Sequence, residues 1–384
     1  MNTIKHFTLL LVFTLVSLFS CEPLQSQNTD RSIHQPPRTE RKVQVALLLD
    51  TSSSMDGLIE QAKSRLWNIV NTMTTLKIDG STPEIEIALY EYGNDNLSKS
   101  DYWIRQVAPL TTDLDLISEK LFALRTNGGL EYCGAVIKRS LDDLNWTNSS
   151  KDIKLIYIAG NESYAQGPVS YKEISKDAIS RNIYINTIYC GNYDYGIKEM
   201  WKDGAEKGEG KYFNIDANKK VRYIVTPYDD EITRCNMRLN ETYYGYGRMG
   251  MEKKAAQVQQ DQNAASIGQA NMAERAVVKS KAVYKNSSWD IVDAVEENEV
   301  DIAKLKDEEL PAELKGKSVE ERKKFIEEKA AERKKIQKEL EELSIKRQKY
   351  IDEEMKKTGS EDDLGNAISK SIIEFASKLG YKQS

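Results

Sequence analysis

Short apolar runs alternate with amphipathic segments between residues 43 and 215. The runs are rich in β-branched and aromatic residues, as strands are, and the segments between them repeat apolar positions at helical spacing. The runs predict strands at residues 43–49, 84–92, 103–108, 153–159, 183–189 and 211–215. The amphipathic segments predict helices at residues 58–73, 114–124, 135–144, 174–179, 197–205 and 229–244. This alternation predicts an open α/β sheet, with the short run at 103–108 as an antiparallel edge strand.

The strand signals disappear in residues 248–384, for which we expect an α-helical C-terminal region. Residues 318–321 (Ser-Val-Glu-Glu) have the pattern of a capping box and predict the start of a long charged helix. Its apolar seam is short and is interrupted by Arg333 and Arg347, which disfavours a long parallel coiled coil. We expect this helix to form an antiparallel hairpin or a small bundle with residues 364–379.

The first twenty residues have the pattern of a secretion signal. They carry Lys5 and then an apolar stretch that is too short to span a membrane, so residues 1–20 are interpreted as a signal peptide. Residues 18–21 (Leu-Phe-Ser-Cys) resemble the lipobox of bacterial lipoproteins, which implies lipidation of Cys21; a chance cysteine after an ordinary signal is the alternative. Residues 21–41 are otherwise polar and predict a flexible tether. We therefore expect a protein anchored by lipid to a membrane of the bacterial cell envelope.

Composition narrows the possible functions. The formal net charge is −5 with both signs spread along the chain, so we expect no nucleic-acid partner. The two histidines precede residue 42, which removes a Ser-His-Asp site and a histidine-containing zinc site from the predicted fold. We therefore do not expect an enzyme. Beyond the lipobox, Cys133, Cys190 and Cys235 allow at most one disulfide; buried free thiols are favoured, and a pair of Cys133 with Cys190 is the alternative.

The first strand ends in a set of hard oxygen ligands. Asp50, Ser52 and Ser54 follow the run at 43–49 at the point where a helix begins, and such side chains bind Mg²⁺, Mn²⁺ or Ca²⁺ rather than zinc or copper. The pattern Asp-x-Ser-x-Ser after a central apolar strand resembles the metal-ion-dependent adhesion site of von Willebrand factor A (VWA) domains. The alternative is that one of these residues merely caps the helix.

The resemblance implies a doubly wound, mostly parallel VWA sheet over residues 42–247, with Mg²⁺ or Mn²⁺ as cofactor. The family's second ligand loop supplies a threonine and its third an aspartate, but this chain has Leu130 and Gly160 at those positions. Glu131 and Glu162 lie close by in sequence, and a longer glutamate side chain is able to reach inward from either position. The alternative is that Glu131 caps its helix and Glu162 is a solvated loop residue. The expected site is thus a degenerate one.

The loops near this edge carry residues typical of contact surfaces. Tyr132, Asn161 and Tyr164 are the candidate partner-binding residues, because tyrosines and polar groups on glycine-containing loops are common in interfaces. The resemblance implies a protein partner that offers a carboxylate to the metal. A metal-free interaction scaffold is the second hypothesis. A hydrolase with Ser52 or Ser54 as nucleophile is the third, and it lacks a histidine base.

Overall fold

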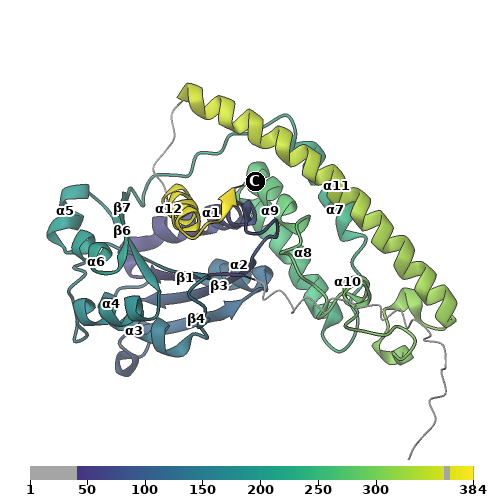
Figure 1. Ribbon diagram of the computed structural model, residues 1–384, viewed down its shortest axis with the longest axis horizontal. Coiled ribbons are helices and arrows are strands. Elements are labelled where there is room, and N and C mark those ends of the chain that lie inside the picture. The colour runs from purple at the N-terminus through teal and green to yellow at the C-terminus, as the bar shows by residue number, and fades with distance from the viewer. Residues whose placement is uncertain (1–40, 359–363, 384) are drawn as a thin grey trace, which may run out of the picture. The chain divides into compact units, whose positions relative to one another are not determined.

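The computed structural model describes residues 41–358 and 364–383, and a six-stranded sheet forms the centre of its α/β part (Figure 1). The strand order is β4-β3-β1-β5-β6-β7, and of these strands only β4 runs antiparallel to its neighbour. The bounds are Lys42–Asp50 for β1, Glu84–Tyr92 for β3, Ile104–Thr111 for β4, Ile153–Gly160 for β5, Tyr184–Cys190 for β6 and Glu209–Ile215 for β7. The predicted mostly parallel sheet with an antiparallel edge strand is confirmed.

Strand β1 lies between β3 and β5 and is buried along nearly its whole length. Leu47 belongs to the core on one face of the sheet and Leu48 to the core on the other. A strand that is covered on both sides has no polar face, which explains the nearly continuous apolar sequence. Asp50 is the last residue of β1 and is paired in register with Tyr92 at the end of β3. The carboxyl ends of the neighbouring parallel strands therefore meet at one edge of the sheet.

Helices cover both faces of the sheet. One face packs against α1 (Asp56–Thr74) and α2 (Leu114–Ala123), and the other against α3 (Cys133–Asp143), α4 (Tyr171–Ser180) and α6 (Trp201–Lys207). The helix expected at residues 197–205 is interrupted, and α5 (Tyr193–Lys198) is separated from α6 by Met200, whose φ of 67° is left-handed. A residue in that conformation ends a right-handed helix. The helix expected at 229–244 is shorter, because α7 spans Asp229–Asn240.

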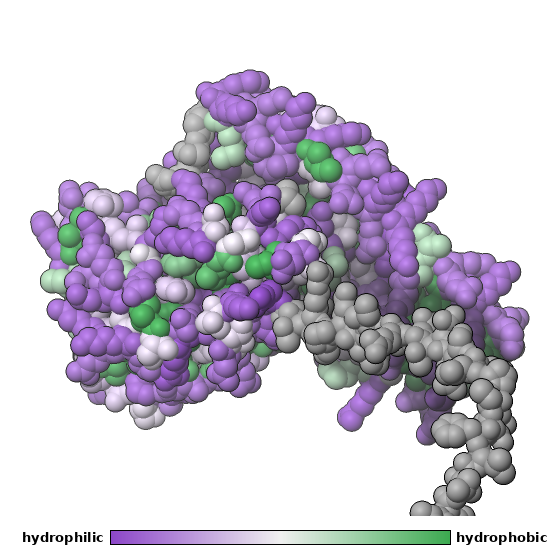
Figure 2. All heavy atoms as spheres, in the orientation of Figure 1, coloured by the Kyte–Doolittle hydropathy of each residue, from purple (hydrophilic) through white to green (hydrophobic). Residues whose placement is uncertain are grey.

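The C-terminal region adds further helices. They are α8 (Gly250–Ile267), α9 (Gln269–Lys279), α10 (Ile291–Glu296) and the long helix α11 (Val319–Thr358). The predicted capping box is present, since the Glu321 amide donates to Ser318 Oγ at 3.2 Å and the Ser318 amide donates to a Glu321 carboxylate oxygen at 2.8 Å. The outward face of α11 is hydrophilic (Figure 2). Among the described helices, none combines the length and the apolar character that a membrane span requires.

Buried ion pairs attach α11 to the neighbouring helices. Arg333, which is 3% exposed at its side chain, bonds Asp290 at 2.7 Å and also contacts Asp293. Arg347 bonds the buried Asp229 at 2.9 Å. The two arginines that interrupt the apolar seam of α11 therefore lie inside the interface, where each finds a carboxylate partner. Because a buried guanidinium is tolerated only when it is paired, these contacts fix how α11 is seated.

The last helix, α12 (Leu364–Lys378), packs on the sheet beside α1 (Figure 1). Ile368, Ile372 and Phe375 join the same core as the strand residues of that face. Ser371 Oγ donates to Asn186 Oδ1 on β6 at 2.8 Å. The short strand β8 (Lys382–Gln383) then pairs antiparallel with β2 (Leu76–Lys77). The expected hairpin of α11 with residues 364–379 is therefore wrong, because the apolar face of α12 is buried against the sheet instead.

Candidate functional site

Backbone hydrogen bonds at the end of β1 place three oxygen-bearing side chains in a tight turn. The Thr51 amide donates to the carbonyl of Tyr92 at 2.9 Å, which extends the pairing with β3 by one residue. The Ser52 amide then donates to Asp50 Oδ1 at 2.7 Å. A short 3₁₀ turn at Ser53–Met55 leads directly into α1. Asp50 is fully buried at this point, so its carboxylate faces the protein interior and the loops above it.

Glu131 reaches this carboxylate from the loop before α3. It is 5% exposed, and its amide donates to Gln166 Oε1 at 2.9 Å. Gly93 lies against both acidic groups, since a Cβ added there would stand 2.7 Å from Glu131 Cγ and 3.0 Å from Asp50 Oδ1. With φ of 78°, Gly93 also has a backbone conformation that favours glycine. The structure thus brings Asp50 and Glu131, two of the candidate ligands, together as a pair.

Burial and mutual repulsion control the protonation of this pair. Burial, and next the neighbouring Asp50 carboxyl, raise the pKa of Glu131 from 4.5 to about 9. Burial also raises the pKa of Asp50, although hydrogen bonds from Glu131 and Ser52 oppose the shift. Two adjacent carboxylates cannot both ionise easily in a dry site. At neutral pH the pair therefore needs either a bound proton or a bound cation.

Hydroxyl and amide groups stand next to the pair. Ser52 Oγ lies 3.2 Å from Ser54 Oγ, and Asn161 Nδ2 donates to Ser54 Oγ at 3.1 Å. Glu162 is exposed, and its negative charge adds to the raised pKa of both acids without completing their hydrogen bonds. No group of three or more His, Cys, Asp or Glu side chains within the described ranges is arranged to hold a metal ion. The available ligands are thus two carboxylates and the serine hydroxyls.

The side chains of Tyr92 and Asp50 occupy the space that a side chain at Gly160 would need. A Cβ added at Gly160 would stand 2.5 Å from Tyr92 Oη and 3.1 Å from Asp50 Oδ2. Tyr92 Oη donates to the Ala159 carbonyl at 2.9 Å, which holds the ring beneath the pair. An aspartate at position 160 would collide with these groups in the present arrangement. The second carboxylate comes from Glu131 in this protein.

Part of the chain is similar to a known protein family. The family model for the von Willebrand factor type A domain matches residues 44–227. These residues form a von Willebrand factor type A domain. No curated protein matches the sequence.

Solved structures similar to this chain include BatB from Bacteroides thetaiotaomicron, with 16% identity, a TM-score of 0.35, and coverage of 45% of this chain and 90% of BatB. Another is an aerotolerance-related membrane protein from Bacteroides fragilis, with 15% identity and a TM-score of 0.32. The match covers 46% of this chain and 93% of that protein. The VWA domain of SpRpn10 has 16% identity and a TM-score of 0.34. The match covers 45% of this chain and 87% of that domain. The assignment of the type A domain therefore rests on the family model.

The candidate contact residues of the type A domain differ in exposure. Tyr132 is partly buried, and its ring packs edge-on against Trp103 at 5.7 Å. Asn161 is also partly exposed and bonds Ser54. Tyr164 is fully buried between Tyr171 and Trp201, so the prediction that its ring lies on the contact surface is wrong.

The loops and the short helix α5 at the carboxyl edge expose several apolar side chains that we call the rim. They follow β3, α2 and β6 and comprise Tyr102, Leu130, Tyr193, Tyr195, Ile197 and Met200. The most exposed of them is Tyr195, at 60%. Exposed tyrosine and aliphatic side chains around a polar centre are typical of protein contact surfaces. The hydrophobic pattern does not reveal Tyr102, Leu130 and Met200 as surface residues, because single apolar residues in loops carry no periodic signal.

The cysteines of the type A domain and of α7 are free thiols. Cys133, Cys190 and Cys235 are all buried and none forms a disulfide, as favoured from the sequence. Cys133 Sγ lies 3.8 Å from Tyr92 Oη, beneath the acidic pair. Burial raises the pKa of both Cys133 and Cys190, so neither is a reactive thiolate at neutral pH. Cys21 lies outside the described residues.

Proposed function

We propose that this protein is a protein-binding module, and not an enzyme, whose type A domain holds a divalent cation at the Asp50 edge. The observation that carries the proposal is the buried acidic pair: Asp50 Oδ2 and Glu131 Oε2 have no hydrogen-bond partner in the described part of the chain. Buried charges of one sign require a compensating cation or a proton. Mg²⁺ or Mn²⁺ would supply that charge and an open position for a carboxylate of the partner protein.

The chain offers both charged and neutral oxygen ligands for such a cation. Asp50 and Glu131 would provide the charged oxygens, and Ser52 and Ser54 the neutral ones, as hard cations prefer. Glu162 is exposed next to them and makes the edge more negative, which favours capture of a cation from solution. The rim exposes apolar side chains at the same edge of the sheet. The partner would therefore present an acidic side chain flanked by apolar ones.

A metal-free interaction scaffold is the second candidate. In that case the acidic pair keeps a proton in place of a cation, and the raised pKa of Glu131 supports this state. The partner would then be recognised by the rim and by Asn161 alone. The two candidates differ in one measurable property, which is whether a divalent cation stabilises the folded protein.

Thermal and urea unfolding in the presence of EDTA, Mg²⁺ or Mn²⁺ tests the cation. Saturating cation at about a hundredfold excess over its Kd should raise the free energy of unfolding by about 2.7 kcal/mol. Glu131→Gln and Asp50→Asn should remove this response while the protein stays folded. Glu206→Gln, at an exposed position on α6, is the matched control and should keep it. An unchanged unfolding transition of the wild-type protein in all three conditions would establish the scaffold instead.

A serine-dependent hydrolase has little support at this site. Ser54 contacts Ser52 and Asn161, and no histidine is present in the described part of the chain. A panel of ester, peptide and phosphate substrates should show no turnover. Turnover that Ser54→Ala abolishes would contradict the binding-module proposal.

We also propose that the protein is anchored in the bacterial cell envelope through a lipid on Cys21. The support is the lipobox pattern at residues 18–21 and the polar segment that follows it. Cys21→Ser should move the protein out of the membrane fraction or block its processing, whereas Ser26→Ala in the tether should change neither. Membrane fractionation of cells that express each variant measures this. If Cys21→Ser fractionates like the wild type, the anchor proposal is wrong.

A further inference from the structure

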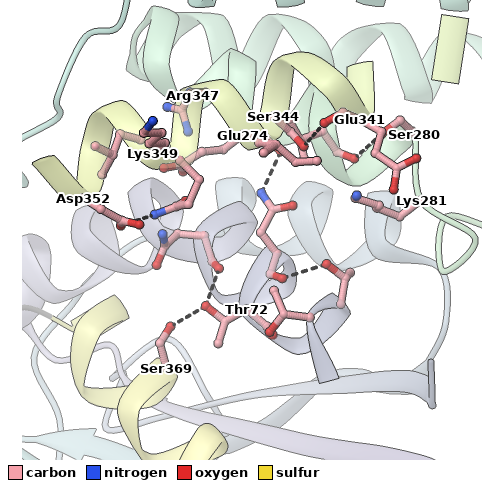
Figure 3. A pocket seen from close by; sticks show the side chains of 18 of the residues that line it. Thr72, Glu274, Ser280, Lys281, Glu341, Ser344, Arg347, Lys349, Asp352 and Ser369 are labelled. Carbon is pink, nitrogen blue, oxygen red and sulfur yellow. Dashed lines mark hydrogen bonds between the residues drawn. The ribbon is translucent and has the colours of Figure 1, made fainter. Parts of the chain in front are cut away.

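A large cleft lies outside the Asp50 edge. It has a volume of about 1340 Å³ and opens between α1, α9, α11 and α12 (Figure 3). One wall is a face of α11 from Lys334 to Met355, and the opposite wall is a face of α1 from Arg65 to Thr74. In Figure 3, Thr72 of α1 and Ser369 of α12 share the hydrogen bond of 3.0 Å that closes one side. None of the residues assigned to the Asp50 edge lines this cleft.

The cleft is long and narrow rather than round. Its α11 wall covers 21 residue steps, which corresponds to about 32 Å at 1.5 Å per residue. The volume also exceeds the range of about 300–1,000 Å³ that is usual for small-molecule sites. These dimensions suit an extended or helical stretch of polypeptide better than a compact metabolite.

The charge of the lining is opposite to that of the whole chain, whose formal net charge is −5. The lining has three acidic side chains, namely Glu274, Glu341 and Asp352. It has eight basic ones, namely Arg65, Lys77, Arg222, Lys281, Lys334, Lys338, Arg347 and Lys349. Arg347 and Lys334 are already paired with Asp229 and Glu296. Lys281, Lys338 and Lys349 form no ion pair with any described residue, so they are available to an incoming anion.

The α11 wall also carries apolar side chains that are exposed or only partly buried. Ile336, Leu340 and Leu343 are buried against the neighbouring helices. Farther along α11, Ile345 is 65% exposed, and Ile351 and Met355 are only partly buried, although all three line the cleft. Exposed apolar groups beside a polar cavity are typical of an interaction site. The wall therefore offers apolar contacts together with cations.

From this combination we propose that the cleft binds an acidic polypeptide segment of a partner protein. Carboxylates of the segment would bond Lys281, Lys338 and Lys349, and its apolar side chains would cover Ile345 and Ile351. Charge complementarity of this kind gives specificity and fast association, and it weakens as salt increases. The cleft would act independently of the cation at the Asp50 edge.

The test is selection of a displayed random dodecapeptide library on the full-length protein. Selected peptides should have a strongly negative net charge, and one synthesised peptide should bind the wild type with an affinity that falls as salt is added. Lys338→Glu/Lys349→Glu should weaken this binding at least tenfold. Lys335→Glu/Lys346→Glu makes the same charge change on exposed positions of α11 that do not line the cleft, and it should keep affinity within twofold.

Other outcomes would overturn the proposal. Selected peptides without an acidic bias, or equal loss of binding in both double variants, would show that the cleft is not the site. Binding of inorganic phosphate or of phosphatidylglycerol vesicles that depends on Lys338 and Lys349, without peptide binding, would identify a different ligand. Urea unfolding of each variant checks that it is folded, and Lys338→Gln/Lys349→Gln provides a milder second variant. EDTA would remove a cation from the Asp50 edge but should not affect peptide binding in the cleft. The failure of one proposal can therefore be distinguished from the failure of the other.

Discussion

In the cation-free protein, the stability should fall as the pH rises through neutrality because of Glu131. Its pKa is about 9 in the folded state, against 4.5 for the ordinary group, so the folded protein binds the extra proton between these values. A raised carboxyl pKa gives stability that is present at low pH and is lost as the pH rises. The loss is about 1.4 kcal/mol per pH unit, hence about 2 kcal/mol between about pH 6.5 and 8.

This pH interval lies between the pKa values of two other shifted groups, and Asp50, whose pKa burial also raises, belongs to the same pair as Glu131. Burial raises the pKa of Asp293 to about 6, and burial lowers that of Lys279 to about 8. Urea unfolding in EDTA should therefore give a clear slope for the wild type. Glu131→Gln should remove most of the slope and stabilise the protein at the upper end of the interval, and saturating Mg²⁺ should also remove it. An equal slope in the wild type and in Glu131→Gln would refute the reasoning.

Three further predictions concern packing and strain. Ile372→Ala in α12 should lower the free energy of unfolding by about 2–5 kcal/mol, whereas Ser377→Ala on its exposed side should change it by less than about 0.5 kcal/mol in the same urea titration. Arg333→Leu should cost about 3–5 kcal/mol, because Asp290 would remain buried without its partner; Asp290→Asn in the same background should recover part of this loss. Gly93→Ala should abolish the response to Mg²⁺ in thermal melts, since the new Cβ would displace Glu131.

The strands were predictable because each is an apolar run bounded by polar turns. All six expected runs correspond to strands of the large sheet, with ends that differ by a few residues. The break at Met200 was not predictable, because a left-handed methionine leaves no mark in the hydrophobic pattern. The partners of Arg333 and Arg347 were not predictable either, since a sequence shows a charge in an apolar seam but not the carboxylate that neutralises it. Local pattern thus gave the elements but not their tertiary partners.

The same distinction applies to the candidate site. Asp50 was a candidate because it follows the first strand in the Asp-x-Ser-x-Ser pattern, and Glu131 because it lies next to Leu130, where the resembled family has a threonine. Tyr164 was misplaced because a tyrosine in a polar loop is expected to be exposed. Its ring occupies space that Gly204 on α6 leaves open, where an added Cβ would stand 2.2 Å from Tyr164 Cε1. That space depends on a residue forty positions away, which loop composition does not reveal.

The position of α12 changes how the helical region relates to the type A domain. The sheet face beside α1 needs a further helix to bury its apolar residues, and the chain supplies it with Leu364–Lys378, long after β7 ends at Ile215. In the sequence, the helices from α7 to α11 are therefore inserted between the last strand of the large sheet, β7, and α12, the helix that completes the cover of this sheet face. Tyr157 Oη, which donates to the Ile368 carbonyl at 3.4 Å, and the apolar groups around it would face water if the chain ended before α12. Burial of that face is worth roughly 25 cal/mol per Å², so the domain and its C-terminal region depend on each other for stability.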